Sequence, residues 1–281
     1  LPEIEGDKIV WSDTRNGNGD IYIYDLSADK ETQITDDPNN QGRPDIWGNN
    51  IVWQDSDVNG VHNIYLYNLP TQEKTRITNT VNNYEDYWWP KISQDKIVFE
   101  YHLGGFVGES DLYTYDLSTE EMTQMTNSPR SEIRPDIYGN KVVWEDSRNE
   151  TDWDIYMYNI STGEETQITN NPNNQAFSSI FKDMIVWSDT RNGNWDIYMY
   201  DLKSKQERQI TTDSSTQVHQ SIYEDKIVWY DRRNGNNDIY MTIIPDFSTI
   251  KGDINKDGIV DFKDFAEFAN DWLKEEEWYE Q

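Results

Sequence analysis

One short segment near the C-terminus carries oxygen-bearing side chains at the spacing of a calcium-binding loop. Calcium takes several hard oxygen ligands, and a twelve-residue loop supplies them from positions one, three, five, seven, nine and twelve, with glycine at position six for a sharp bend. Segment 253–264 has Gly258 at that bend. The candidate metal ligands are Asp253, Asn255, Asp257, the carbonyl of Ile259, Asp261 and Asp264. The pattern predicts one bound Ca²⁺ as the cofactor of this segment.

No catalytic constellation is recognisable in the rest of the sequence. The three histidines, His62, His102 and His219, lie far apart in the chain, and no nucleophile elbow, glycine-rich phosphate loop or helical metal motif is present. The 53 acidic residues are too numerous for a glycosidase carboxylate pair to be identified by sequence. We therefore assign no catalytic residue and favour binding over catalysis.

The elements that position these residues follow from an internal repeat. Related segments begin at Ile9, Ile51, Ile97, Val142, Ile185 and Ile227. Successive starts differ by 42, 46, 45, 43 and 42 residues, a period typical of repeat architectures. Each copy contains four short runs rich in β-branched and aromatic residues, separated by turn residues such as Asn-Gly. Four strands per unit and six units predict an all-β fold, a six-bladed β-propeller of four-stranded antiparallel blades over residues 1–248.

The repeats share the pattern Pro-x-Ile-x-Gly-Asn-Lys-Ile-Val-Trp-x-Asp-x-Arg-Asn-Gly-Asn-x-Asp-Ile-Tyr-x-Tyr-Asp-Leu, closing on Gln-Ile-Thr. This pattern resembles the TolB-type propeller repeat, particularly the version found in bacterial and archaeal surface proteins. The resemblance covers roughly residues 1 to 245. It implies the six-bladed fold, whereas propellers carry many functions, so the function must be argued from a site.

Two copies depart from the pattern. The sixth copy lacks the Gln-Ile-Thr ending and meets Pro245 instead, so we expect its blade to be one strand short unless residues 248–250, or residues preceding Leu1, supply that strand. The third copy is preceded by an aromatic stretch, 84–89, and has Phe99-Glu100-Tyr101 in place of Trp-x-Asp. A position that differs from its own repeat is a candidate for function.

We expect a ligand site at the mouth of the central channel, beside blade three. Propeller topology places stretches 84–89 and 101–108 as loops on one face, just before or after the inner strands. Aromatic platforms with cationic and hydrogen-bonding neighbours suit a glycan or protein ligand. The candidate ligand-binding residues are Trp88, Trp89, Tyr101, His102, Arg43 and Arg134.

The Asp-x-Arg loops recur around the ring as Asp13/Arg15, Asp146/Arg148, Asp189/Arg191 and Asp231/Arg233. A second series of calcium sites is conceivable, but the arginine would oppose a cation. Turn chemistry explains the motif better: aspartate closes an Asx turn, Asn-Gly supplies positive φ, and arginine pairs with a carboxylate of the blade. We interpret these loops as scaffold.

The C-terminal segment 249–273 combines the calcium loop with a helical pattern. Phe262, Phe265, Phe268 and Trp272 recur at three- and four-residue spacing, which predicts one apolar face of a helix. Aspartate at position twelve, followed by Phe-Ala-Glu-Phe-Ala-Asn-Asp-Trp-Leu, resembles the dockerin repeat, a relative of the EF-hand. The chain shows one such repeat where a dockerin carries two. The resemblance leaves two expectations: a calcium clip whose helix packs on the propeller, or recruitment of a cohesin-like or self partner. Residues 274–281 form an acidic tail.

The composition limits the partners. Lys and Arg number 24 against 53 Asp and Glu, a net charge of −29, which excludes nucleic acid because no basic face exists to bind phosphates. Cysteine is absent, and no apolar run is long enough for a membrane span. We therefore expect a non-catalytic propeller that is secreted or lies on the cell surface and acts as a binding or scaffold module. The alternatives are a carbohydrate-active enzyme, either a polysaccharide lyase or a glycoside hydrolase, and a surface-layer structural component.

Overall fold

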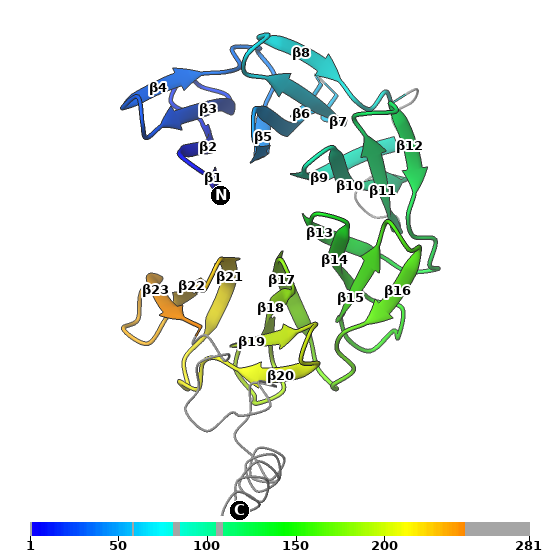
Figure 1. The fold of residues 1–281 in the computed structure, drawn as a ribbon, viewed down its shortest axis with the longest axis vertical. Helices are drawn as coiled ribbons and strands as arrows, with labels where there is room; N and C mark the ends of the chain where they lie inside the picture. The colour runs from blue at the N-terminus through cyan, green and yellow to red at the C-terminus, as the bar shows by residue number, and fades with distance from the viewer. Residues whose placement is uncertain (1, 58, 81–84, 105–108, 245–281) are drawn as a thin grey trace, which may run out of the picture.

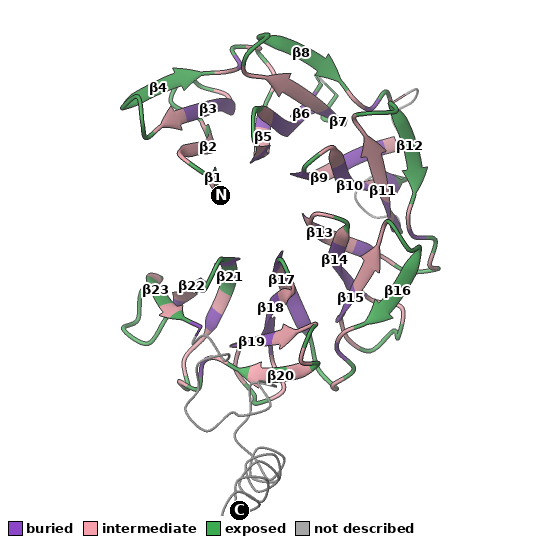
Figure 2. Cartoon of the chain, in the orientation of Figure 1, coloured by how far each residue is buried: buried purple, intermediate pink, exposed green. Residues whose placement is uncertain are grey.

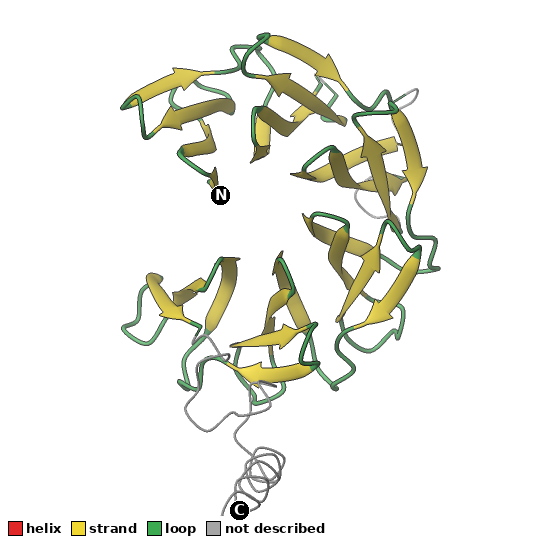
Figure 3. Ribbon diagram, viewed as in Figure 1, coloured by secondary structure: helices red, strands yellow, loops and turns green. Residues whose placement is uncertain are grey.

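The computed structural model describes residues 2–57, 59–80, 85–104 and 109–244. Their strands form six antiparallel sheets arranged as blades around a central axis (Figure 1). Within these residues every regular element is a strand, as Figure 3 shows. No described helix is long and apolar enough to cross a membrane. The prediction of a six-bladed all-β propeller is confirmed.

Each blade runs from an inner strand beside the axis to an outer strand at the rim. The inner strands are β1 (Glu3–Glu5), β5 (Gln41–Trp47), β9 (Glu85–Ser93), β13 (Glu132–Tyr138), β17 (Gln175–Phe181) and β21 (Gln217–Tyr223). The second strands are β2 (Lys8–Asp13), β6 (Asn50–Ser56), β10 (Lys96–Leu103), β14 (Lys141–Asp146), β18 (Met184–Asp189) and β22 (Lys226–Asp231). The third strands are β3 (Asp20–Asp25), β7 (His62–Asn68), β11 (Ser110–Asp116), β15 (Asp154–Asn159), β19 (Asp196–Asp201) and β23 (Asp238–Ile243). The outer strands are β4 (Lys30–Gln33), β8 (Glu73–Arg76), β12 (Glu121–Gln124), β16 (Glu164–Gln167) and β20 (Gln206–Gln209).

Blade 6 has three strands within the described residues, β21 to β23. The sequence predicts this shortfall from the missing Gln-Ile-Thr ending. In blades 1 to 5 the threonine of that ending anchors the outer strand. Its hydroxyl accepts the backbone N–H of the third strand, as between Thr35 and Ile21 at 2.8 Å and between Thr211 and Ile197 at 2.8 Å. Residues 248–250, which we considered for the missing strand, lie outside the described part.

The core consists of five hydrophobic clusters, and each joins two adjacent blades. The cluster between blades 4 and 5, for example, contains Val143, Ile155, Ile180, Ile185 and Trp187. Equivalent clusters join blades 1 and 2, 2 and 3, 3 and 4, and 5 and 6. We call these the five seams. Burial therefore concentrates on the inner three strands, while the outer strands β4, β8, β12 and β16 are exposed throughout (Figure 2).

Candidate functional site

Five inner strands each carry one residue in the left-handed backbone region at the same end of the channel. The pairing between the inner and second strands shifts by a β-bulge at each of these places. A bulge bends the strand and re-aims its side chain. We call these residues the mouth ring: Arg43 (φ 52°), Trp89 (φ 49°), Arg134 (φ 52°), Phe177 (φ 59°) and His219 (φ 56°).

The preceding blade fixes the backbone of the mouth ring. The N–H of Trp89 donates to Gln54 Oε1 at 3.3 Å, that of Arg134 to Glu100 Oε1 at 2.6 Å, and that of Phe177 to Glu145 Oε1 at 2.7 Å. A side chain in the middle of each second strand thus holds the next inner strand. Because left-handed conformations are costly for residues with a Cβ, they persist only where the surroundings impose them. The preceding blade therefore holds the backbone at three of the five mouth-ring positions, Trp89, Arg134 and Phe177.

Cationic and aromatic side chains alternate around this ring. The Arg43 Cζ lies 3.3 Å from the ring centroid of Trp89, and the Arg134 Cζ lies 5.9 Å from the same centroid. Arg134 also lies 4.8 Å from the Phe177 ring, whose centroid is 4.1 Å from that of His219. Guanidinium groups over aromatic faces gain cation–π attraction that grows with desolvation. The five side chains form one continuous surface.

The two arginines differ in their charge partners. Arg134 donates from Nη1 to both carboxylate oxygens of Glu145, at 2.9 and 3.2 Å. Burial raises the pKa of Glu145, and Arg134 acts in the opposite direction. The guanidinium of Arg43 makes no hydrogen bond and no ion pair to any described residue. Burial lowers the pKa of Arg43; the negative charge of Glu100 raises it, and the positive charge of Arg134 lowers it further. Burial likewise lowers the pKa of His219, and the positive charge of Arg134 acts in the same direction.

Beside the ring, Trp88 lies between two histidines. Its ring centroid is 4.0 Å from that of His62 and 6.5 Å from that of His102. Each histidine contacts a carboxylate: His62 Nδ1 is 3.1 Å from Asp86 Oδ1, and His102 Nε2 is 2.7 Å from Glu100 Oε2. Glu100 thus holds both a histidine and the backbone of Arg134.

The structure brings five of the predicted site residues together at one end of the channel, whereas Tyr101 packs in the seam of blades 2 and 3, its ring 5.3 Å from that of Tyr113. Tyr101 and His102 belong to β10 and pair with Tyr87 and Asp86 of β9, so they are not in a loop. Trp88 and Trp89 also lie within a strand, because aromatic contacts such as Tyr87 to Tyr101 at 5.3 Å extend the pairing. Arg43 and Arg134 lie inside their inner strands, at the bulges, and not before them. Trp88 and Trp89 are both partly exposed. Segments 81–84 and 105–108 lie outside the described residues.

Sequence reasoning missed Glu100, Glu145 and His62 as parts of this site. A signal was available for the two glutamates. Each glutamate is the residue that directly follows the Trp or Phe of the second strand. Other repeats have Ser12, Gln54 and Ser188 at this position. An acidic residue on a buried strand is unusual without a partner. Phe177 and His219 share the repeat position of Arg43, but differ from it in chemistry.

The Asp-x-Arg loops are scaffold, as predicted. In blade 5, Asp189 accepts the N–H of Arg191 at 2.8 Å and the indole N–H of Trp187 at 3.1 Å. The guanidinium of Arg191 pairs with Asp189 and Glu207 and lies 4.2 Å from the Tyr198 ring. The equivalent contacts recur at Asp13/Arg15, Asp146/Arg148 and Asp231/Arg233. Each loop fastens the second strand to its own blade.

A charge cluster lies deeper in the channel, between blades 1 to 4. Lys91 pairs with Glu3, and its Nζ is 3.9 Å from Asp45 Oδ1. Burial raises the pKa of Asp45 to about 7, although Lys91 acts in the opposite direction. Asp45 and Asp136 each also accept a backbone N–H from the neighbouring blade, Ile92 at 2.7 Å and Ile180 at 2.9 Å. These carboxylates are inter-blade fasteners.

The opposite end of the channel is lined by a second aromatic group at the ends of the inner strands. Trp47 meets Tyr138 edge to face at 5.9 Å, Tyr138 lies 4.8 Å from Phe181, and Phe181 lies 4.9 Å from Tyr223. Ser93 takes the same position in blade 3, and its hydroxyl accepts the N–H of Gly139 at 2.9 Å. This end lacks the alternation of cations and rings seen at the mouth ring.

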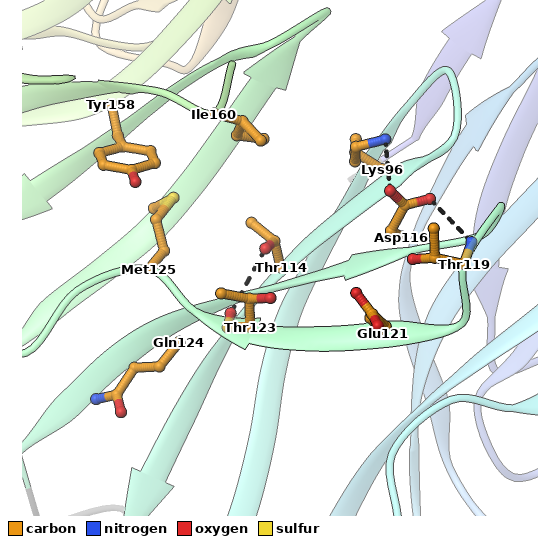
Figure 4. A pocket seen from close by; sticks show the side chains of 10 residues that line it. All are labelled: Lys96, Thr114, Asp116, Thr119, Glu121, Thr123, Gln124, Met125, Tyr158 and Ile160. Carbon is orange, nitrogen blue, oxygen red and sulfur yellow. Dashed lines mark hydrogen bonds and ion pairs between the residues drawn. The ribbon is translucent and has the colours of Figure 1, made fainter. Parts of the chain in front are cut away.

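A hollow of about 240 Å³ lies between the outer parts of blades 3 and 4 (Figure 4). Its one cation among the lining residues, Lys96, is already paired with Asp95 at 2.8 Å and Asp116 at 3.0 Å. The walls are otherwise threonines, Glu121, Gln124, Met125, Tyr158 and Ile160. Among its described lining residues this hollow offers no unpaired cation, in contrast to the mouth ring.

Metal-ligating side chains do not cluster within the described part of the chain: no group of three or more His, Asp or Glu there could hold a metal ion. The predicted calcium loop, 253–264, with its helix and the acidic tail, lies outside the described residues. The calcium assignment therefore stays a prediction.

Comparison with solved structures shows that TolB proteins and several enzymes share this propeller fold. The fold is similar to TolB from Acinetobacter baumannii, with a TM-score of 0.62 and 18% identity over 85% of this chain and 62% of that one. It is also similar to an oligogalacturonate lyase in complex with manganese, with a TM-score of 0.64 and 15% identity over 84% and 71%. An acylaminoacyl peptidase from Pyrococcus horikoshii matches with a TM-score of 0.61 and 16% identity over 86% and 44%.

These likenesses concern the fold alone, since the identities are low and the similar proteins differ in activity. The chain spans less than two thirds of the Acinetobacter TolB. No protein-family model and no curated protein matches the sequence. Function must therefore be inferred from the mouth ring.

Proposed function

We propose that this chain is a non-catalytic binding or scaffold propeller of the cell surface or the secreted fraction, and that it recognises a glycan or protein ligand at the mouth ring. One observation carries the proposal: five side chains of cationic and aromatic character, all on residues with a left-handed backbone, share one end of the channel. Preset aromatic and arginine side chains are typical of binding hot spots, because little conformational entropy is lost on association.

The carboxylates at the mouth support binding over catalysis. Glu100 uses one oxygen for the backbone of Arg134 and the other for His102. Glu145 accepts from the backbone of Phe177 and from the guanidinium of Arg134. A general acid or base needs an oxygen or nitrogen within reach of the substrate. Both carboxylates are instead engaged in holding the ring.

The test is ligand binding by two aromatic variants at opposite ends of the channel. A glycan array with the intact protein identifies a ligand, and calorimetry then compares Trp89→Ala with Tyr223→Ala, an exposed aromatic at the far end. Loss of the mouth aromatic should cost about 1–3 kcal/mol of binding, while Tyr223→Ala should leave the affinity unchanged. Retained binding by Trp89→Ala, with loss in Tyr223→Ala, would move the site to the other end.

We further propose that Asp253, Asn255, Asp257, Ile259, Asp261 and Asp264 bind one Ca²⁺ and order the C-terminal segment. The resemblance to a dockerin repeat supports this, and such a helix would then pack on the propeller or recruit a cohesin-like or second-copy partner. Asp257→Ala should abolish calcium binding in calorimetry, because it removes a charged ligand from the middle of the loop. Asp29→Ala, on an exposed turn of the propeller, is the matched control. An unchanged calcium isotherm in Asp257→Ala refutes the assignment.

One observation favours a second candidate, a polysaccharide lyase. The His102–Glu100 pair lies next to Arg134. A lyase removes a proton from a sugar next to the substrate's carboxylate, which needs a base, here His102, close to a cation that neutralises that carboxylate, here Arg134. Incubation with acidic polysaccharides distinguishes the two: a lyase releases shorter chains with new unsaturated ends, whereas a binder leaves the chain length unchanged.

A further inference from the structure

Arg43 is a cation without an anionic contact in a strongly acidic chain. The sequence has 53 acidic residues for 24 Lys and Arg, so every basic side chain has an excess of possible partners. Other arginines of the described part use them: Arg15, Arg148, Arg191 and Arg233 pair with aspartates, Arg130 with Glu150, and Arg134 with Glu145. The guanidinium of Arg43 has no carboxylate within ion-pair distance among the same residues.

The position of Arg43 explains why the chain does not neutralise it. Stacking on Trp89 at 3.3 Å and the bulge at φ 52° hold the side chain in the mouth ring. The buried carboxylates nearby are occupied, Glu145 by Arg134 and Glu100 by His102. A half-buried guanidinium beside a second one is electrostatically unfavourable until an anion arrives. An anion that binds at Arg43 would therefore be stabilised by a positive charge that no described carboxylate neutralises by direct contact.

We propose that Arg43, with Arg134 beside it, binds the carboxylate of an acidic oligosaccharide built from uronic acid residues. This inference rests on the proposed function, because it names the ligand class of the same site. The planar guanidinium matches a carboxylate in a two-point hydrogen bond, and its stacking on Trp89 leaves the N–H edges for that contact. Trp88, Trp89 and Phe177 are partly exposed, and their rings add apolar surface beside the carboxylate contact.

The backbone favours a sugar over an acidic peptide. Extended peptides bind exposed strand edges by adding a strand. At the mouth, five inner strands are bulged and contain a left-handed residue, and bulges interrupt regular edge pairing. A ligand at this end must therefore be recognised by side chains.

The net charge of −29 does not prevent binding of a short acidic ligand. The screening length is about 8 Å at physiological ionic strength, so distant surface carboxylates have little effect at the mouth. Within that range lie Arg43 and Arg134, together with the carboxylates Glu100 and Glu145. Glu145 is paired with Arg134 and Glu100 is bonded to His102, so the charge left for the ligand is that of Arg43. Short oligomers should bind better than long polymers, which would extend over the acidic rim.

The experiment uses calorimetry with the full chain and three probes: tri-galacturonate, its methyl ester and tri-glutamate. Tri-galacturonate should bind, and the ester should bind at least about tenfold more weakly, because it lacks the charge. Arg43→Gln should weaken tri-galacturonate by about tenfold and Arg43→Lys by less, since lysine keeps the charge but not the planar fork. Arg130→Gln, an exposed ion-paired arginine, is the control.

Each other result overturns a defined part. If tri-galacturonate and its methyl ester bind equally well, and Trp89→Ala weakens both, the claim that Arg43 recognises a carboxylate is wrong. The proposed glycan site at the mouth ring is then still supported. Tighter binding of tri-glutamate overturns the sugar class in favour of an acidic peptide. Absence of binding by all three probes overturns the inference, and the glycan array then decides separately whether the proposed function also fails.

Discussion

The two seams on either side of blade 5 and the two end faces of the blade series place the same residue types in opposite environments. Ile197 and Met199 on blade 5 are buried to 0% and 1% exposure, whereas their repeat equivalents on blade 6, Ile239 and Met241, are 75% and 56% exposed. On blade 1, Ile4 is 55% exposed, while its equivalent Ile180 is 4% exposed. No buried cluster joins blades 6 and 1 within the described residues.

This difference shows where the stability of the fold originates. A blade alone cannot bury its apolar faces, so each seam depends on a neighbour, as in other repeat proteins. The end faces keep the pattern of a seam: Val228, Ile239 and Met241 on blade 6, and Ile4 and Leu26 on blade 1. The repeat therefore encodes faces that fit one another, and burial follows only where two of them meet.

The largest effect should come from removing a seam tryptophan. Trp187 is fully buried, stacks on Tyr198 at 6.2 Å and donates to Asp189. Trp187→Ala should lower the free energy of unfolding by about 3–5 kcal/mol, because it leaves a large cavity and removes one hydrogen-bond donor from Asp189. Trp11, its equivalent on blade 1, is partly exposed, so Trp11→Ala should cost less than half as much. Urea denaturation of both variants measures the difference, and equal losses would show that the blade 1 face is also packed in solution.

The architecture was predictable because the repeat is visible six times. The period, the turn residues and the Gln-Ile-Thr ending predict six blades with a short sixth, and each of the six repeat starts falls in the second strand of a blade. The Asp-x-Arg loops were also predictable, since a short-range turn and its ion pair depend on neighbouring residues.

The mouth ring was predictable only in part. The departures in copy three indicated Trp88, Trp89, Tyr101 and His102, but their placement in strands depends on cross-strand aromatic contacts. The link from Glu145 to Phe177 joins adjacent blades, and such a contact depends on how neighbouring blades dock in space and not on neighbouring residues in the sequence. The bulges that set φ near 50° arise from that geometry as well.

A smaller effect should distinguish one seam from the others. Glu132 is fully buried at the seam of blades 3 and 4, where the equivalent residues are Gln41, Gln175 and Gln217. Burial raises the pKa of Glu132 to about 7, although hydrogen bonds from Ser128 and Thr126 act to lower it. The amides of the three glutamines donate to the backbone carbonyls of Asn39, Asn173 and Ser215, a bond that a carboxylate cannot make.

Glu132→Gln should therefore stabilise the protein in a pH-dependent way. The folded pKa lies above the unfolded value of 4.5, so the folded state binds more protons between pH 4.5 and 7 and loses stability as the pH rises through that window. The variant lacks this loss, and its gain should grow from near zero at pH 4.5 to about 2 kcal/mol at pH 8. Denaturation midpoints at both pH values measure it, with Glu121→Gln on the exposed β12 as control. A gain that does not change with pH would refute the raised pKa.

The smallest effect should come from the end face of blade 6. Ile239→Ser should change the free energy of unfolding by no more than about 0.5 kcal/mol, because the side chain is already mostly exposed. Ile197→Ser, the same substitution in the seam of blades 5 and 6, should cost about 2–5 kcal/mol through lost burial and a cavity.

If both variants lose similar stability, the end face is covered in solution. Sedimentation velocity then separates a second copy, which would raise the molecular mass, from contact with blade 1 of the same chain, which would not. An introduced cysteine pair at Ile4 and Ile239 tests that last contact directly, since the chain has no other cysteine to compete for the bond.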